Sequence, residues 1–388
     1  MNRLSKGNTI QNNTEVKAPG KILWIGGYSV LERPNISFVS AVDAYVTAKL
    51  KTNSGVDIEL DVPQLNMSAK GKIDHATGKI IGDYQKELLL LKTAAEVALR
   101  YVVGLGLNVS GFGITTKNDA PFAYSLSTGK VVKSGLGSSA AVTVATVGAV
   151  LKAFDADPAE NDALHKLAQT AHSIATGKVG SGFDIAASSF GSIFYTRYSP
   201  EILKVLPAEY SNKQLVDLVR KPWDYRIEKF SLPNKFRLLF ANFGEAMITT
   251  AAVGSVSDFK KRNPDEYNKL IKQINDENVR AVDALKKIGA CDKDAIMPFK
   301  DAFDKGRLLT KKLGELSNME VEPEDCTKLI EESKAKGAFV AKLPGAGGMD
   351  AIAALALDTK SYDTLKAYWN KRKDLSMLPI KTVDIGVI

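Results

Sequence analysis

The pattern of apolar and polar residues divides the first part of the chain into short strands and one long helix. The apolar run 22–25 lies between Pro19-Gly20 and Gly26-Gly27, which predicts a buried strand. Residues 38–51 and 56–62 predict the two strands of a hairpin that turns at Asn53-Ser54-Gly55. A smaller hairpin over 70–81, a helix over 85–103 and a strand over 107–116 follow.

The remaining chain alternates helices with fewer strands. Helical spacing predicts helices over 140–154 and from Asp157-Pro158 to about Gly177, and then a strand over 192–198. Four prolines make 199–233 irregular, so we place a domain boundary there. Beyond it we expect strands at 236–242 and 380–387, a helix start within 244–256, and helices over 264–289, 294–316, 323–336 and 362–373. The 388-residue length predicts two domains, or three, and we divide the chain into a tail (1–14) and two domains (15–225 and 226–388).

The composition limits the kinds of ligand and the cellular location that we expect for this protein. The net charge is +8, but the basic residues are scattered, so we expect small anionic ligands rather than nucleic acid. Two cysteines, Cys291 and Cys326, are too few for a disulfide framework, which is typical of a reducing compartment. No apolar run reaches the roughly 18 residues of a membrane span, and residues 1–14 lack the apolar core of a secretory signal. These features predict a cytoplasmic protein without a membrane partner.

A glycine- and serine-rich stretch, residues 133–142 (KSGLGSSAAV), precedes a long apolar helix. Gly135 and Gly137 allow close approach of the backbone to a phosphate, and the free N–H groups and dipole of the helix start favour its negative charge. The stretch has neither the G-x-x-x-x-G-K-[ST] nor the G-x-G-x-x-G pattern. It is therefore either a triphosphate site of another type or an ordinary strand-to-helix turn.

Three further glycine-containing segments carry reactive side chains. Lys21 follows Gly20, Asp184 lies in the loop 178–187, and Asp350 ends the loop 344–350. Taken singly, Lys21 is an ordinary surface charge and Asp184 an ordinary helix cap. Together with the hydroxyl of Ser138, they supply a cation, a hydroxyl and carboxylates, which are the groups that phosphoryl transfer requires.

The stretches APGKILWIGGYSVL (18–31), KSGLGSSAAV (133–142) and PGAGGMDAIAAL (344–355) resemble motifs one, two and three of the GHMP kinases in order and spacing. Within that family the chain is most similar to the phosphomevalonate kinases of eukaryotic type. Three features carry this likeness: Gly26-Gly27-Tyr28 replaces Gly-Glu-His, residues 180–184 read GSGFD, and Pro344 opens the third motif.

The resemblance implies an α+β, two-domain GHMP kinase fold, with an N-terminal domain like ribosomal protein S5 domain 2 and a ferredoxin-like C-terminal domain. It implies ATP and Mg²⁺ as cofactors and 5-phosphomevalonate as acceptor, in a monomer or homodimer. Lys21, Asp184 and Ser138 would be catalytic, and Ser138 would bind the Mg²⁺. The implied nucleotide site consists of Asn118, Asp119, Lys133, Ser134, Gly135, Leu136, Gly137, Ser138, Ser139 and Ala140. The implied acceptor site consists of Lys21, Tyr28, Ser181, Gly182, Asp184, Thr249, Thr250, Gly345, Ala346, Gly347, Gly348 and Asp350.

Other functions share these motifs. Mevalonate kinase and mevalonate-phosphate decarboxylase belong to the same superfamily. A GHMP-fold ligand sensor would bind ATP without transferring phosphate, but such a protein should have lost Lys21, Ser138 or Asp184. A nucleic-acid module would fit the basic charge and would show salt-sensitive binding.

Overall fold

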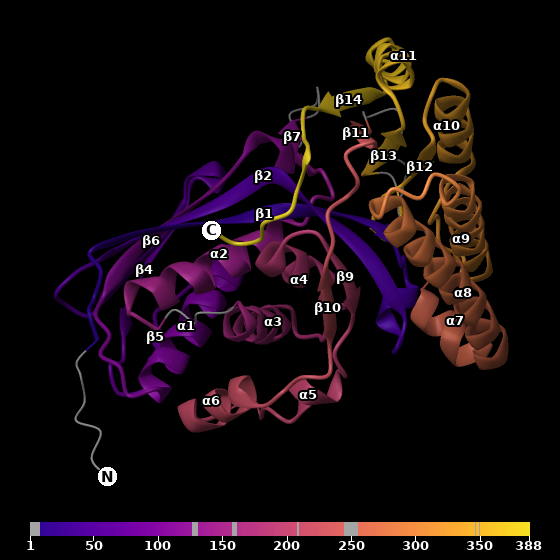
Figure 1. The fold of residues 1–388 in the computed structure, drawn as a ribbon. Helices are drawn as coiled ribbons and strands as arrows, with labels where there is room; N and C mark the ends of the chain where they lie inside the picture. Colours follow the sequence, from indigo (N-terminus) through magenta and orange to yellow (C-terminus); the bar gives the residue numbers. More distant parts are fainter. Residues whose placement is uncertain are drawn as a thin grey trace.

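The computed structural model describes residues 8–125, 131–156, 161–207, 209–243, 255–345, 347–348 and 350–388. Within these residues the chain builds two sheets with helices packed on them (Figure 1). No helix in these ranges is both long and apolar enough to cross a bilayer.

The large sheet is mostly antiparallel and has the order β10-β9-β2-β6-β3-β4-β5, with β1 and β15 also paired to β2. Its longest members are β1 (Asn13–Ile25) and β2 (Ile36–Thr52), which pair along most of their length. The other strands are β3 (Asp57–Val62), β4 (Met67–Ile73), β5 (Ile80–Ile81), β6 (Phe112–Asn118), β9 (Ile193–Thr196), β10 (Arg226–Lys229) and β15 (Thr382–Val383). A separate two-stranded ribbon, β7 (Ala123–Ser125) and β8 (Val131–Lys133), leads into the second glycine motif.

Helix α2 (Ser138–Ala153) is the centre of the first core. Its small and branched apolar residues are buried on almost every side, as expected for a helix that is hydrophobic all round. It packs against β1, β2, α1 (Leu89–Gly104), α3 (Asp162–Thr176) and α4 (Phe183–Phe190). Short helices α5 (Glu201–Lys204) and α6 (Asn212–Arg220) complete this part of the fold. The first motif strand and the second motif helix are therefore held by one core.

The second sheet has the order β12-β13-β11-β14 and is antiparallel. Its strands are β11 (Arg237–Phe243), β12 (Val340–Lys342), β13 (Ala351–Ala356) and β14 (Leu375–Leu378). Helices α7 (Val256–Arg262), α8 (Pro264–Gly289), α9 (Ile296–Leu316) and α10 (Glu324–Ala335) follow the first strand, and α11 (Thr359–Asn370) follows the third. Numbered along the chain, the strand order is 2-3-1-4, which is the ferredoxin-like arrangement. The α+β two-domain fold is thus confirmed.

Several predicted elements differ from the structure. The predicted hairpin of 38–51 and 56–62 is wrong, because β6 lies between β2 and β3 and pairs with both. The region 199–233 is not irregular throughout, since α5, α6 and β10 form there. Strand β14 had no counterpart in the prediction, and the last strand is limited to β15.

The division of the chain at residue 225 stays a prediction. Strand β10, just after that point, pairs with β9 in the large sheet. Strand β15, near the C-terminus, also returns to the large sheet and pairs with β2. At the other end, Thr14 already belongs to β1, and Asn8 donates to the carbonyl oxygens of Asn108 and Phe154.

Candidate active site

Lys21 lies in β1 and points into the second glycine motif. Its backbone N–H donates to the Leu136 carbonyl at 2.9 Å, and its Nζ donates to the Gly135 carbonyl at 2.6 Å. The residue is only 7% exposed, and its Nζ lies 5.7 Å from the ring centre of Phe183. The amine is therefore held at the turn before α2. Lys21 is not the ordinary solvated surface charge that the sequence also allowed.

The second motif adopts a glycine-dependent turn. Gly135 and Gly137 have φ values of +69° and +82°, and Gly137 is the N-cap residue of α2. A Cβ at Gly137 would lie 2.9 Å from Lys21 Cε, so the absent side chain makes room for the lysine. Ser138 is the first residue of α2, at the positive end of the helix dipole. The turn thus presents amide groups and a hydroxyl beside a buried amine.

Asp184 lies in the first turn of α4, after the loop that contains Ser181 and Gly182. Gly182 has φ +76° and its carbonyl accepts from Gln169 Nε2 at 2.8 Å, while the Ser181 carbonyl accepts from Tyr195 Oη at 3.2 Å. Burial lowers the pKa of Lys21, and the charges of Asp184 and Asp350 oppose that shift. Both carboxylates therefore act on the same amine, although they come from different glycine loops.

The third glycine loop brings Asp350 to this place. The Gly348 N–H donates to the Val321 carbonyl at 2.9 Å, and a Cβ on Gly347 would collide with the same oxygen. A Cβ on Gly135 would lie 3.7 Å from Asp350 Cβ, so the second and third motifs are neighbours. The Asp350 side chain keeps contact with solvent, yet partial burial raises its pKa and Lys21 partly opposes this.

Other predicted residues lie around this centre with different partners. Tyr28 has φ +55° and packs on a hydrophobic cluster of α7, α8 and α9. Asn118 ends β6, and the Asp119 carboxylate accepts from the Tyr45 N–H at 2.8 Å.

Lys133 is exposed at the end of β8. Ser139 and Ala140 continue the first turn of α2, and Gly345 lies at the third loop with φ +69°. Thr249, Thr250 and Ala346 lie outside the described residues.

Sequence reasoning missed the residues that support the motifs. Asn242 is fully buried in β11, and its Nδ2 donates to Ser134 Oγ at 3.0 Å, which ties the second motif to the second sheet. Gln169 is 3% exposed and supports Gly182, as above. Ser188 Oγ donates to the Pro19 carbonyl at 2.8 Å and ties α4 to β1. An asparagine inside the apolar run 238–243 was the one available signal, because buried amides require partners.

Comparisons with known proteins show the family and the fold to which this chain is similar. Residues 89–192 match the family model "GHMP kinases N terminal domain". A phosphomevalonate kinase of Saccharolobus solfataricus is 30% identical over 92% of this chain and 94% of its own length. A peroxisomal phosphomevalonate kinase of Arabidopsis thaliana is 27% identical over 93% of both chains. Among solved structures, Streptococcus pneumoniae phosphomevalonate kinase in complex with phosphomevalonate and AMPPNP superposes with a TM-score of 0.73 at 19% identity, covering 95% of this chain and 100% of its own.

Proposed function

The chain belongs to the GHMP kinase family, and we propose that it is a phosphomevalonate kinase. It would transfer the γ-phosphoryl group of ATP to (R)-5-phosphomevalonate and release ADP and (R)-5-diphosphomevalonate, a step of the mevalonate route to isoprenoids. The observation that carries the proposal is the meeting of Lys21, Asp184 and Asp350 at the turn of the second motif. A buried cation beside free amide groups suits a reaction that is mostly positioning and charge neutralisation.

The acceptor's chemistry assigns the larger role to Lys21. A phosphate monoester has a second pKa of about 6, so at pH 7 it is already largely ionised and requires little base catalysis. What opposes reaction is repulsion between two anionic phosphates, and a fixed amine reduces it. We assign Lys21 to this screening and Asp184 to positioning Lys21 or the acceptor, or to accepting a proton from the monoanion.

The nucleotide would lie with its triphosphate at the α2 N-terminus, bounded by Ser134, Gly135 and Ser139, as the second motif predicts. Tyr28, Ser181, Gly182 and the third loop would face the acceptor, and Thr249 and Thr250 stay predictions for its phosphate.

The donor set also fits Mg²⁺. Ser138 offers a hydroxyl at the phosphate site, and the carboxylates of Asp184 and Asp350 lie around the neighbouring amine. In the described part of the chain no group of three or more His, Cys, Asp or Glu side chains could hold an ion. Mg²⁺ commonly binds through one or two protein oxygens and the substrate phosphates, so it does not require a cluster of three acidic ligands. When bound, the ion would neutralise charge on the β- and γ-phosphates.

Acceptor identity is tested by measuring ADP release separately with mevalonate, 5-phosphomevalonate and 5-diphosphomevalonate, with CO₂ followed in parallel. We expect turnover with 5-phosphomevalonate alone and no CO₂. Preference for mevalonate, or CO₂ release with 5-diphosphomevalonate, would instead assign one of the two sister activities. ATP binding without turnover of any acceptor would indicate a ligand sensor.

Location and assembly remain predictions. We place the enzyme in the cytoplasm as a monomer or homodimer, although the Arabidopsis relative is named as peroxisomal. Cell fractionation and light scattering would test these two points.

A further inference from the structure

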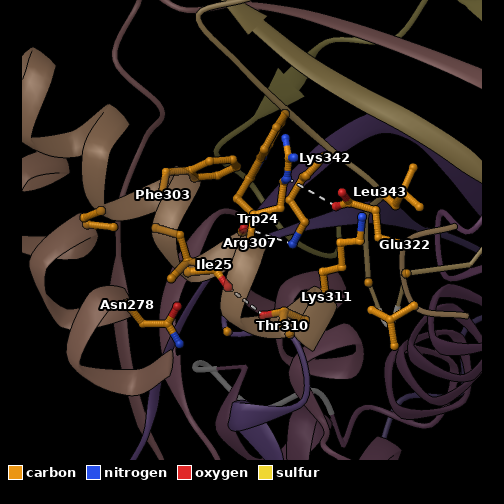
Figure 2. Close-up of a pocket in the computed structure, with 18 residues that line it drawn as sticks. Trp24, Ile25, Asn278, Phe303, Arg307, Thr310, Lys311, Glu322, Lys342 and Leu343 are labelled. Atoms are coloured by element: carbon orange, nitrogen blue, oxygen red, sulfur yellow. Dashed lines mark hydrogen bonds and ion pairs between the residues drawn. The ribbon is translucent and has the colours of Figure 1, made fainter. Parts of the chain in front are cut away.

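A cavity lies behind the third glycine loop, on the side of helix α9. Its walls come from the end of β1, α8, α9, the turn before α10 and the third loop, and Figure 2 shows the side chains that line it. The centre of a water-sized sphere can occupy about 40 Å³ of it. Since one water needs about 10–15 Å³ by this measure, the cavity has room for a few oxygen-sized atoms or one larger ion.

The charged side chains in its walls are predominantly basic. Arg307, Lys311 and Lys342 line the cavity, and Glu322 is the carboxylate among them (Figure 2). Arg307 Nε lies 3.2 Å from Glu322 Oε2, and both side chains are at most 5% exposed. Two more acids, Glu331 and Glu324, reach Arg307 and Lys311 from outside, but they are 55% and 71% exposed. Their charges are therefore screened by solvent, and the interior keeps an excess of positive charge.

One cation in this wall has spare donor capacity. Arg307 Nη1 is buried and has no hydrogen-bond partner among the described residues, while Nη2 donates to Glu331 Oε1 at 2.8 Å. Lys342 Nζ donates one hydrogen bond to the Trp24 carbonyl at 3.1 Å. A buried guanidinium N–H without a partner is destabilising, so a bound hydrogen-bond acceptor in the cavity would stabilise the fold.

We propose that this cavity is a binding site for one small inorganic anion of halide size, chloride under physiological conditions. The anion accepts from Arg307 Nη1 and lies among the Lys311 and Lys342 amines, where it compensates the excess charge that Glu322 leaves. Its ligands belong to α9 and β12, so the anion would not compete with ATP or the acceptor for Lys21, Ser138 or Asp184. Gly345 and Gly347 share the cavity wall, so occupancy would also stabilise the third loop.

Thermal unfolding in chloride and in gluconate at equal ionic strength tests the proposal, since gluconate is too large for the cavity. We expect the Tm to rise with chloride and to saturate, with inorganic phosphate, a larger anion, giving a smaller rise. Lys311→Gln should reduce the chloride effect. Lys328→Gln, which removes an exposed ion-paired lysine on the neighbouring helix α10, should leave it unchanged. Equal Tm values in chloride and gluconate would overturn the site.

A second measurement locates the ion without any variant. Crystals grown in bromide should show anomalous density in the cavity within hydrogen-bond distance of Arg307. Ordered water at that position, with no anomalous signal, would show that water satisfies the guanidinium and would overturn the proposal.

Discussion

Replacing Lys21 by methionine is the sharpest test of the assigned chemistry. The change keeps the length and apolar contacts of the side chain but removes the amine that lies 2.6 Å from the Gly135 carbonyl. At about 4 Å and an effective dielectric constant of about 20, one unit charge contributes about 4 kcal/mol to a neighbouring charge. This corresponds to a factor of about 10³ in rate. We therefore expect kcat to fall by about 10²–10³.

Asp184→Asn is the companion variant, because it keeps the shape and hydrogen bonding of the side chain. At pH 7 we expect it to keep near-full kcat, since the acceptor is already ionised, and to lose more below about pH 6, where the monoanion dominates. The assay is steady-state ADP release at saturating ATP and acceptor, with Tm measured to check folding. Lys17→Met is the control and should match the parent, because this lysine lies on the same strand and its side chain is 45% exposed. Equal large losses in both variants at pH 7, or a kcat for Lys21→Met within tenfold of the parent, would refute the reasoning.

Three further outcomes follow from the structure. Gly137→Ala should lower Tm slightly and kcat by more than tenfold, because its Cβ would displace Lys21, whereas Gly106→Ala, with a similar φ of +78° but open space, should lower Tm alone. Gly347→Ala should lower both Tm and the apparent acceptor affinity more than Gly106→Ala does, and an unchanged KM would contradict the proposed place of the third loop. Burial, with the nearby Arg307 charge, lowers the pKa of Lys342 to about 8, partly opposed by Glu322. Between pH 8 and about 10.5 the unfolded chain thus binds more protons, so stability should rise with pH by up to about 3 kcal/mol, and Lys342→Met should remove this rise in urea-unfolding measurements.

The sequence predicted the local parts of the site because their signals are local. Gly135, Gly137 and Gly182 lie just before helix starts and have φ values of +69° to +82°. Residues other than glycine rarely adopt this backbone conformation. The helices of the second half were predicted for the same reason, as α8 and α9 carry long amphipathic patterns.

The elements and contacts that were predicted wrongly or missed depend mostly on contacts between distant parts of the chain. The turn 53–55 looks like a hairpin, but the buried face of β6 competes for β2 and inserts between the two strands. Helix α6 was missed although Ser211 and Gln214 form a capping box, because the surrounding prolines outweighed that short signal. The approach of Asp350 to Gly135 has no sequence signature at all, since it depends on how the second sheet docks.

The return of the C-terminal segment to the large sheet limits how the enzyme can open. The two halves are joined by the chain once between β10 and β11 and again between β14 and β15. The second connection is fastened by hydrogen bonds of Lys381 with Asp43 and of Ile388 with Lys17. Two halves that are joined at two separate points cannot rotate relative to each other as freely as two halves joined by a single linker. We therefore expect the motion that admits and releases nucleotide to be a hinge rotation about the line through both connections, or a sliding of packed helices.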